Sequence, residues 1–152
     1  MASMLKQHED VVLNFTQLNS DQNLNAALRQ EGRLLRGKAL IEMQELKYAI
    51  EDLKEAAIDT RSVFGAEAKY RLAQLYFDDK QTSEAETQVF QLINSGTPHR
   101  YWLARGFILL ADIYIGKEDY FQAKQYLLSL QSNYTDNEEI NQMIEQRITL
   151  CK

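Results

Sequence analysis

The chain is poor in residues that carry chemistry or interrupt helices. Its 152 residues include one Cys, two His, one Pro and six Gly. A single Cys excludes an intrachain disulfide, and one Cys with two distant His residues does not make the ligand set of a structural zinc site. So little Pro and Gly is unusual for an all-β fold, which needs frequent turns. We therefore expect long helices, no metal and no cofactor.

The chain also lacks a basic excess and a long hydrophobic run. Its formal net charge is −5, which argues against nucleic acid because phosphate binding needs a basic face. No apolar run approaches the roughly 20 residues of a membrane-spanning helix. The best candidate, Phe107 to Ile115, is short and contains Asp112. We expect a soluble protein with no nucleic-acid partner and no membrane span.

No catalytic constellation is visible. A nucleophile needs a base and an orienting group near it, and Cys151 is expected to lie in a tail. Carboxylate pairs such as Asp78-Asp79 fall at turns or in first helical turns, where acids interact favourably with the helix dipole. Their spacing does not match a calcium loop. We expect no catalytic residues and a protein that is not an enzyme.

Apolar residues at helical spacing fill most of the chain. The pattern predicts helices at residues 5–19, 23–43, 46–60, 65–79, 83–95, 98–116, 119–133 and 136–150. Gly96-Thr97-Pro98 predicts a helix stop, an N-cap and a first helical residue. Gly116 predicts a left-handed helix end, and Asp119 a cap for the next helix. Two further sites fit capping boxes, Ser83 with Glu86 and Thr135 with Glu138.

An internal repeat is the strongest pattern. Leu72-Ala73-x-x-Tyr76…Ala85 returns 38 residues later as Leu110-Ala111-x-x-Tyr114…Ala123, and a fainter copy, Gly37-x-x-Leu40…Ala49, lies 36 residues upstream. Such a period is typical of helical repeat arrays. Small residues let the two helices of a unit approach closely. We therefore expect three small residues to face three others: Gly37, Ala73 and Ala111 against Ala49, Ala85 and Ala123.

These units resemble the tetratricopeptide repeat (TPR), whose pattern is W-x2-L-G-x2-Y on the first helix and A-x3-F on the second. The third unit gives Phe107-x2-Leu110-Ala111-x2-Tyr114 and then Ala123-x3-Leu127. The repeat is longer than the family's period of about 34 residues, Trp is absent from its position and the trailing Pro is missing. The resemblance implies an all-α fold, a right-handed solenoid of antiparallel helix pairs with about three repeats and a C-terminal capping helix.

The resemblance also implies a domain plan. We expect one domain over 1–152, with a half repeat at 5–22, repeats at about 26–60, 65–96 and 98–134, and a capping helix at 136–150. The apolar stripe of that last helix comprises Ile140, Met143, Ile144, Ile148 and Leu150. The chain resembles the C-terminal part of a long bacterial TPR protein and is expected to be a piece of a longer array. Periplasm or cell envelope is then favoured over cytoplasm.

A concave groove is the binding surface that the resemblance implies. First helices of successive TPR units line it, which places these residues there: Lys38, Glu67, Tyr70, Gln74, Phe77, Arg105, Ile108 and Asp112. An apolar strip edged by mixed charges suits an extended peptide or a partner helix. In the alternative, the C-terminal helix or a neighbouring segment covers much of this strip.

Three functions remain open from the sequence. The first is a non-catalytic protein–protein interaction or scaffolding module with a protein or peptide partner. The second is glycan or small-ligand binding by a helical-repeat protein of the bacterial cell envelope, with Tyr101 and Trp102 as a stacking platform, although Trp102 at this place also suits packing between repeats. The third is a structural spacer that self-associates through its open N-terminal end.

Overall fold

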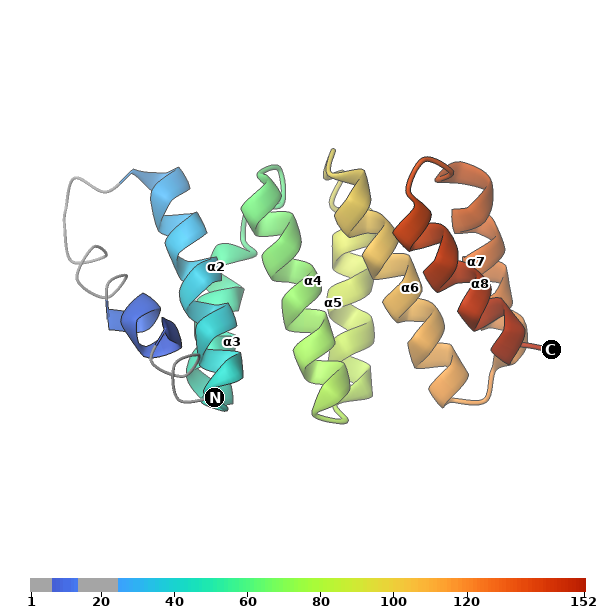
Figure 1. Ribbon diagram of the computed structural model, residues 1–152, viewed down its shortest axis with the longest axis horizontal. Helices are drawn as coiled ribbons and strands as arrows, with labels where there is room; N and C mark the ends of the chain where they lie inside the picture. The colour runs from blue at the N-terminus through green and yellow to red at the C-terminus, as the bar shows by residue number, and fades with distance from the viewer. Residues whose placement is uncertain (1–6, 14–24) are drawn as a thin grey trace. The chain divides into compact units, whose positions relative to one another are not determined.

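The computed structural model describes residues 7–13 and 25–152, and within these ranges the chain is helical and contains no strand (Figure 1). The predicted all-α class is therefore confirmed. A helical segment at 7–13 is followed by α2 (Ala26–Glu42), α3 (Leu46–Ala56), α4 (Val63–Asp78), α5 (Thr82–Asn94), α6 (Arg100–Gly116), α7 (Tyr120–Asn133) and α8 (Glu138–Leu150). The chain divides into two compact units, Met1–Leu72 and Ala73–Lys152, with α4 running through the division. The expectation of one domain over 1–152 stays a prediction.

The helices lie where the apolar spacing predicts them, with shifted ends. Gly96 takes the left-handed conformation expected of a helix stop, with φ at 74°. Pro98 is not the first helical residue, however, because α6 begins at Arg100 with His99 as its N-cap. The N–H of His99 donates to the Thr97 hydroxyl over 3.3 Å, so Thr97 organises the turn before the helix. The helix expected at 5–19 lies partly outside the described residues.

One turn occurs three times in the same form. Gln44, Lys80 and Glu118 have φ of 62°, 63° and 61°, and they are separated by the same 36 and 38 residues as Ala49, Ala85 and Ala123. In each turn the next N–H donates to the carbonyl five residues before it: Glu45 to Leu40 (2.9 Å), Gln81 to Tyr76 (2.8 Å) and Asp119 to Tyr114 (2.9 Å). This bond closes a helix in the Schellman manner. The sequence repeat is thus also a repeat of local backbone structure.

Several helices begin or end at residues other than those predicted from the sequence. Gly116 is the last residue of α6, and Glu118 takes the left-handed conformation instead. Ser83 lies inside the first turn of α5, so its capping box is wrong. At α8 the cap is Asn137 rather than Thr135. Asp119 caps α7 as predicted, accepting a first-turn N–H at 3.2 Å.

In unit 1, α2 and α3 form a closely packed hairpin. Gly37 makes the close approach possible, because a Cβ there would lie 2.9 Å from Leu53 Cδ2. Ala49 is fully buried, as its place in the repeat predicts. The small residue of α2 therefore meets Leu53, about one helical turn beyond Ala49.

A buried ion pair adds to this hairpin. Asp52 is only 3% exposed. Arg36 donates to both of its carboxylate oxygens over 2.6 Å, and Arg33 lies 3.5 Å away. Arg36 stands at the position of the internal repeat that Leu72 and Leu110 hold in the later units, so an ion pair takes the place of an aliphatic side chain there.

The start of α4 is tied to α2 through Gln30. The Gln30 side-chain amide donates to the carbonyls of Ala56 and Asp59 over 2.8 Å each, and its oxygen accepts the Ser62 hydroxyl over 2.5 Å. Gly65 lies against this arrangement, since a Cβ there would be 1.8 Å from the Asp59 carbonyl oxygen. A glycine is needed here because the backbone approaches too closely for any side chain.

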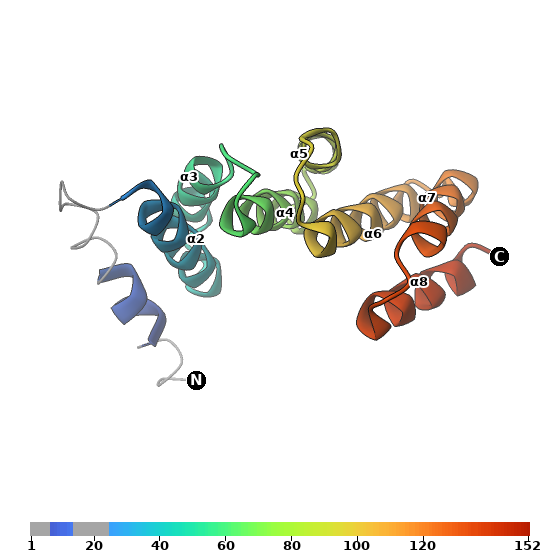
Figure 2. The ribbon, with the colours of Figure 1, turned by 90° about the horizontal axis from the view of Figure 1, so that it is seen from above.

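In unit 2, α6 packs against α5 and α7, and α8 lies along α6 and α7 (Figure 2). The predicted stripe of α8 is confirmed for Ile140 and Ile144, which are fully buried, and is wrong for Leu150, which is 60% exposed. Cys151 is not in a free tail. It is buried in the same hydrophobic cluster as Ile140, and this burial raises the pKa of its thiol.

Candidate partner-binding groove

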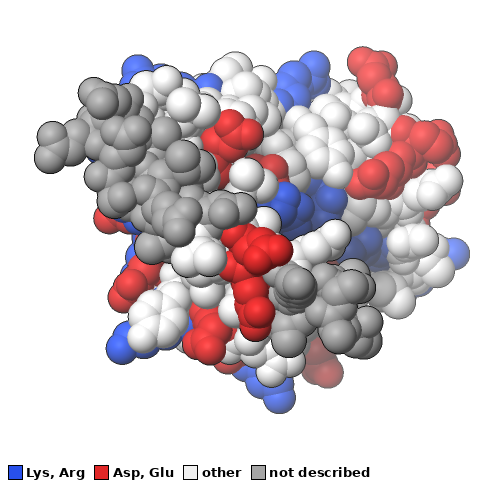
Figure 3. Space-filling model, turned by 60° about the vertical axis from the view of Figure 1, so that its left-hand side comes forward, with Lys and Arg blue, Asp and Glu red and all other residues white. Residues whose placement is uncertain are grey.

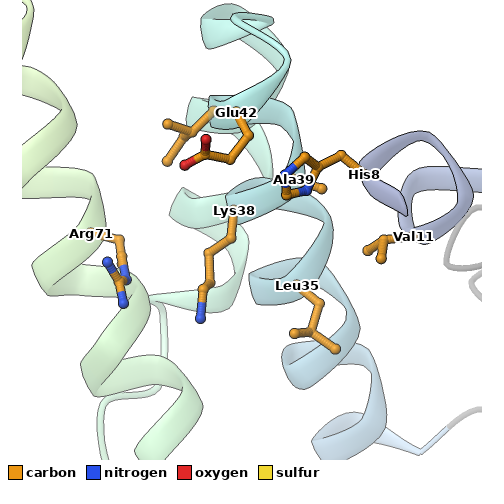
Figure 4. Close-up of a pocket in the computed structure, with 8 residues that line it drawn as sticks. His8, Val11, Leu35, Lys38, Ala39, Glu42 and Arg71 are labelled. Carbon is orange, nitrogen blue, oxygen red and sulfur yellow. The ribbon is translucent and has the colours of Figure 1, made fainter. Parts of the chain in front are cut away.

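Unit 1 contains an open groove of about 490 Å³ between the 7–13 segment and α2. Its lining residues come from three segments: His8 and Val11 from 7–13, Leu35, Lys38, Ala39, Ile41 and Glu42 from α2, and Arg71 from α4 (Figure 4). Among these residues, Lys38 was predicted for the groove from the sequence, whereas Leu35 and Val11 were not. The sequence pattern placed the groove on the first helices of the units alone, so it gave no reason to choose Val11, and helical spacing did not show that Leu35 is exposed.

The floor of the groove is apolar on one side. Figure 4 shows Leu35 and Val11 on the side of the 7–13 segment. Leu35 is 47% exposed although it sits in the middle of α2. Burying such a side chain stabilises a complex by roughly 25 cal/mol per Å² of apolar surface removed from water. The groove can therefore hold an apolar side chain of another segment.

The other side of the groove is charged. Lys38 Nζ and Arg71 Nε lie 2.9 Å and 3.0 Å from the same oxygen of Glu67. These two cations thus share one carboxylate. Glu42, one turn beyond Lys38 on α2, is exposed and adds a negative charge at that end. On the face of the molecule shown in Figure 3, acidic and basic side chains are likewise mixed.

The structure brings together only some of the predicted groove residues. Lys38 and Glu67 form an ion pair in unit 1. Tyr70 is only 4% exposed, so a partner cannot contact it in this structure. Gln74 and Phe77, in the part of α4 that belongs to unit 2, are half-buried. Gln74 donates to the Asp78 carboxylate one turn along its own helix.

In unit 2 the predicted strip lies under α8. Ile108 is 2% exposed within the cluster that includes Ile140 of α8. Asp112 accepts two bonds from Arg147 of α8, over 2.7 Å and 3.1 Å. Arg105 donates to the Tyr101 hydroxyl over 2.9 Å. For these residues the structure has the covered arrangement, and a partner cannot reach Ile108 while α8 is in place.

Tyr101 and Trp102 do not present one flat surface. Their ring centroids are 4.9 Å apart, and the rings meet edge to face at 81°. The Tyr101 hydroxyl donates to Glu139 over 2.7 Å, and burial is the main cause that raises the pKa of Tyr101. A sugar that stacks on one ring would thus not continue onto the other, so this geometry does not favour the glycan function.

A polar cluster that the sequence did not predict joins α5 to α6. Glu86 accepts the Tyr114 hydroxyl over 2.9 Å and the Lys117 ammonium over 2.7 Å. The bond from Lys117 is the main cause that lowers the pKa of Glu86, and the bond to Glu86 raises the pKa of Tyr114 to about 12. These shifts keep the carboxylate charged and the phenol protonated, which suits a structural link rather than acid–base chemistry.

Neither a metal-binding cluster nor a membrane-spanning helix occurs in the part of the chain that the structure describes. No group of three or more His, Cys, Asp or Glu side chains is arranged there to hold a metal ion. None of the helices there is both long and apolar enough to cross a membrane.

Comparison with protein-family models finds no match to the chain, and comparison with curated proteins and with solved structures finds no significant similarity. The resemblance to TPR proteins therefore rests on the residues of the chain itself.

Proposed function

We propose that this chain is a non-catalytic protein–protein interaction or scaffolding module, built as a right-handed solenoid of TPR-like antiparallel helix pairs and part of a larger TPR array. The repeat of one Schellman turn at Gln44, Lys80 and Glu118 supports the three units. Helix hairpins that follow one another with a constant turn bury their apolar faces on their neighbours. A place in the bacterial periplasm or cell envelope belongs to the same proposal, on the resemblance alone.

The groove in unit 1 is the observation that carries this function. It combines an exposed leucine, a volume of about 490 Å³ and a charged wall. Apolar contact supplies affinity and charge supplies orientation when one protein binds a segment of another. The partner is therefore a segment of a protein that buries an apolar side chain on Leu35 and pairs with the groove charges. No nucleic acid is part of the proposal.

Peptide selection on the intact chain tests this function. Peptides would be selected from a displayed random library and their dissociation constants measured by fluorescence anisotropy. Leu35→Glu is expected to weaken the selected peptides at least about tenfold, which corresponds to roughly 1.4 kcal/mol. Ile58→Glu makes the same chemical change at a residue that is 78% exposed and outside the groove, so it should leave binding unchanged.

Circular dichroism of both variants would first establish that each is folded. Equal binding of the selected peptides to Leu35→Glu and Ile58→Glu would show that the groove is not the binding site. A library that gives no binder at all would argue against the interaction function itself.

A further inference from the structure

In unit 2, α8 covers the face of α6 on which the TPR resemblance places the partner-binding groove. Ile108 of α6 is 2% exposed and lies in one hydrophobic cluster with Ile140 and Ile144 of α8, which are fully buried. Arg105 and Asp112, the other groove positions of α6, both face side chains of α8. The chain itself therefore supplies a helix at the place where the resemblance expects a partner.

The polar contacts of α8 fix the direction in which it lies on α6. Near its start, the Glu139 carboxylate accepts the Tyr101 hydroxyl over 2.7 Å and lies 3.5 Å from Arg105 Nη1. Near its end, Arg147 donates to both carboxylate oxygens of Asp112, over 2.7 Å and 3.1 Å. The acid and the base of α8 are about 12 Å apart along the helix axis, and the base and the acid of α6 about 10.5 Å. Matched spacing of opposite charges thus favours one parallel orientation.

α8 has the features of a helix that binds in a groove. Its start is capped by the Asn137 side chain, which accepts the Ile140 N–H over 3.0 Å. Acids in its first turn and Arg147 in its last turn interact favourably with the helix dipole. Only two of its 13 residues are buried, whereas seven of the 17 residues of α6 are. Because so little of α8 is buried, it can separate from α6 at a lower cost than unfolding α6 requires.

We propose that α8 is an autoinhibitory helix, which closes the groove face of α6 until a partner helix of the same chemistry replaces it. Such a helix carries an acid, apolar residues one and five positions later, and a base eight positions later, as do Glu139, Ile140, Ile144 and Arg147. The loop 134–137 that tethers α8 is short, so α8 competes at an effective concentration on the order of 1 mM. The inference rests on the proposed function, since it gives the interaction module a second, closed surface.

Cys151 reports the opening of α8 in the unmodified chain. It is the only Cys of the chain, it follows α8 directly, and it is 8% exposed in the cluster that contains Ile140. Its rate of reaction with a thiol reagent would be measured with and without a designed peptide free of Cys. This peptide of about 18 residues, roughly five helical turns, has Glu, Ile, Ile and Arg at the spacing of α8 in a background of Ala and Gln. A control peptide has its Glu and Arg exchanged.

We expect the designed peptide to accelerate the reaction of Cys151 at least about threefold at a few millimolar, because a peptide that binds only the open form increases its population. The control peptide should have no effect, since it brings like charges against Arg105 and Asp112. Equal acceleration by the two peptides would show that these charges do not select the helix. No acceleration by either would show that α8 is a fixed cap, and both results overturn the inference.

Two variants connect the thiol reaction and peptide binding to α8. Ile144→Ala weakens the attachment of α8, whereas Leu92→Ala removes an equally buried side chain from α5, outside the cluster under α8. Ile144→Ala should react at least about tenfold faster than the parent and bind the designed peptide at least about tenfold more tightly by anisotropy. Leu92→Ala should lower the urea midpoint and leave both quantities within about twofold. Equal changes in the two variants would mean that the face opens only when unit 2 unfolds, which overturns the inference.

Failure of this inference and failure of the proposed function give different results. Leu35→Glu alters the groove beside α2 in unit 1, so it should not change the effect of the designed peptide on Cys151. If library peptides bind in a Leu35-dependent way and the designed peptide has no effect even on Ile144→Ala, the autoinhibitory role of α8 fails and the proposed function stands. If neither kind of peptide binds, both fail.

Discussion

Replacement of Gly65 by Ala is expected to destabilise unit 1 far more than one added methyl group suggests. A Cβ at this position would lie 1.8 Å from the Asp59 carbonyl oxygen and 2.6 Å from Gln30 Nε2. Carbon and oxygen atoms do not approach so closely, and the first clash is with backbone rather than with a flexible side chain. The start of α4 would therefore have to move away from the loop that holds Asp59.

The size of the effect follows from what this movement breaks. Overpacking a buried site costs about 1–3 kcal/mol. The displaced carbonyl of Asp59 is also one of two acceptors of the Gln30 amide, and each lost hydrogen bond costs about 1 kcal/mol or more when its partner stays buried. We expect the free energy of unfolding to fall by about 2–5 kcal/mol.

Urea unfolding followed by circular dichroism measures this change. Gly116→Ala is the matched control, because Gly116 ends α6 and a Cβ there meets nothing within 4 Å. That variant should be as stable as the parent or more stable by up to about 1 kcal/mol. The only Trp of the chain, Trp102, lies in unit 2. In Gly65→Ala the unfolding midpoint followed by Trp fluorescence should therefore fall less than the midpoint followed by circular dichroism. Equal midpoints for the two variants would refute the packing described around Gln30.

Three further predictions concern the packed seams. Leu110→Ala should lower stability by about 2–5 kcal/mol because this side chain is fully buried, and an unchanged thermal melt would contradict its placement. Asp52→Ala should cost about 3–5 kcal/mol by leaving Arg36 without its carboxylate, while the double replacement of Arg36 and Asp52 by Leu should cost much less; equal losses in chemical denaturation would argue against the ion pair. The pKa of Tyr114 is raised from 10.0 to about 12, so its contribution is complete below pH 10 and is lost as the pH rises through 12. Subtracting the ultraviolet titration of Tyr114→Phe from that of the parent should leave one tyrosine that ionises near pH 12, and ionisation near pH 10 would show that the bond to Glu86 is absent.

The sequence predicted the helices well because each depends on residues close together in the chain. Apolar spacing located α2 to α8, and the alanines of the repeat, such as Ala85 and Ala123, are fully buried as expected. The turns were harder to predict. Gln44, Lys80 and Glu118 are not turn formers by type, so the nearby Gly116 attracted the prediction although its backbone is helical.

The site was harder still because it depends on contacts between distant residues. Lys38 and Glu67 were both placed on the groove, but their ion pair joins residues 29 positions apart. Burial of Tyr70 and Ile108 could not be inferred from helical spacing alone, since a residue that faces a groove and one that faces a covering helix obey the same period. The exposure of Leu35 could not be inferred from helical spacing either.

The three identical turns have a consequence for stability. An L-amino acid in the left-handed conformation costs roughly 1–2 kcal/mol, because its Cβ crowds the carbonyl oxygen, and Gln44, Lys80 and Glu118 all adopt that conformation. The chain therefore carries the same local strain three times, at one fixed point of each hairpin. Glycine at any of these positions would release most of it without touching a packed side chain. The chain thus contains three equivalent positions at which hairpins of different sequence can be stabilised by one and the same substitution.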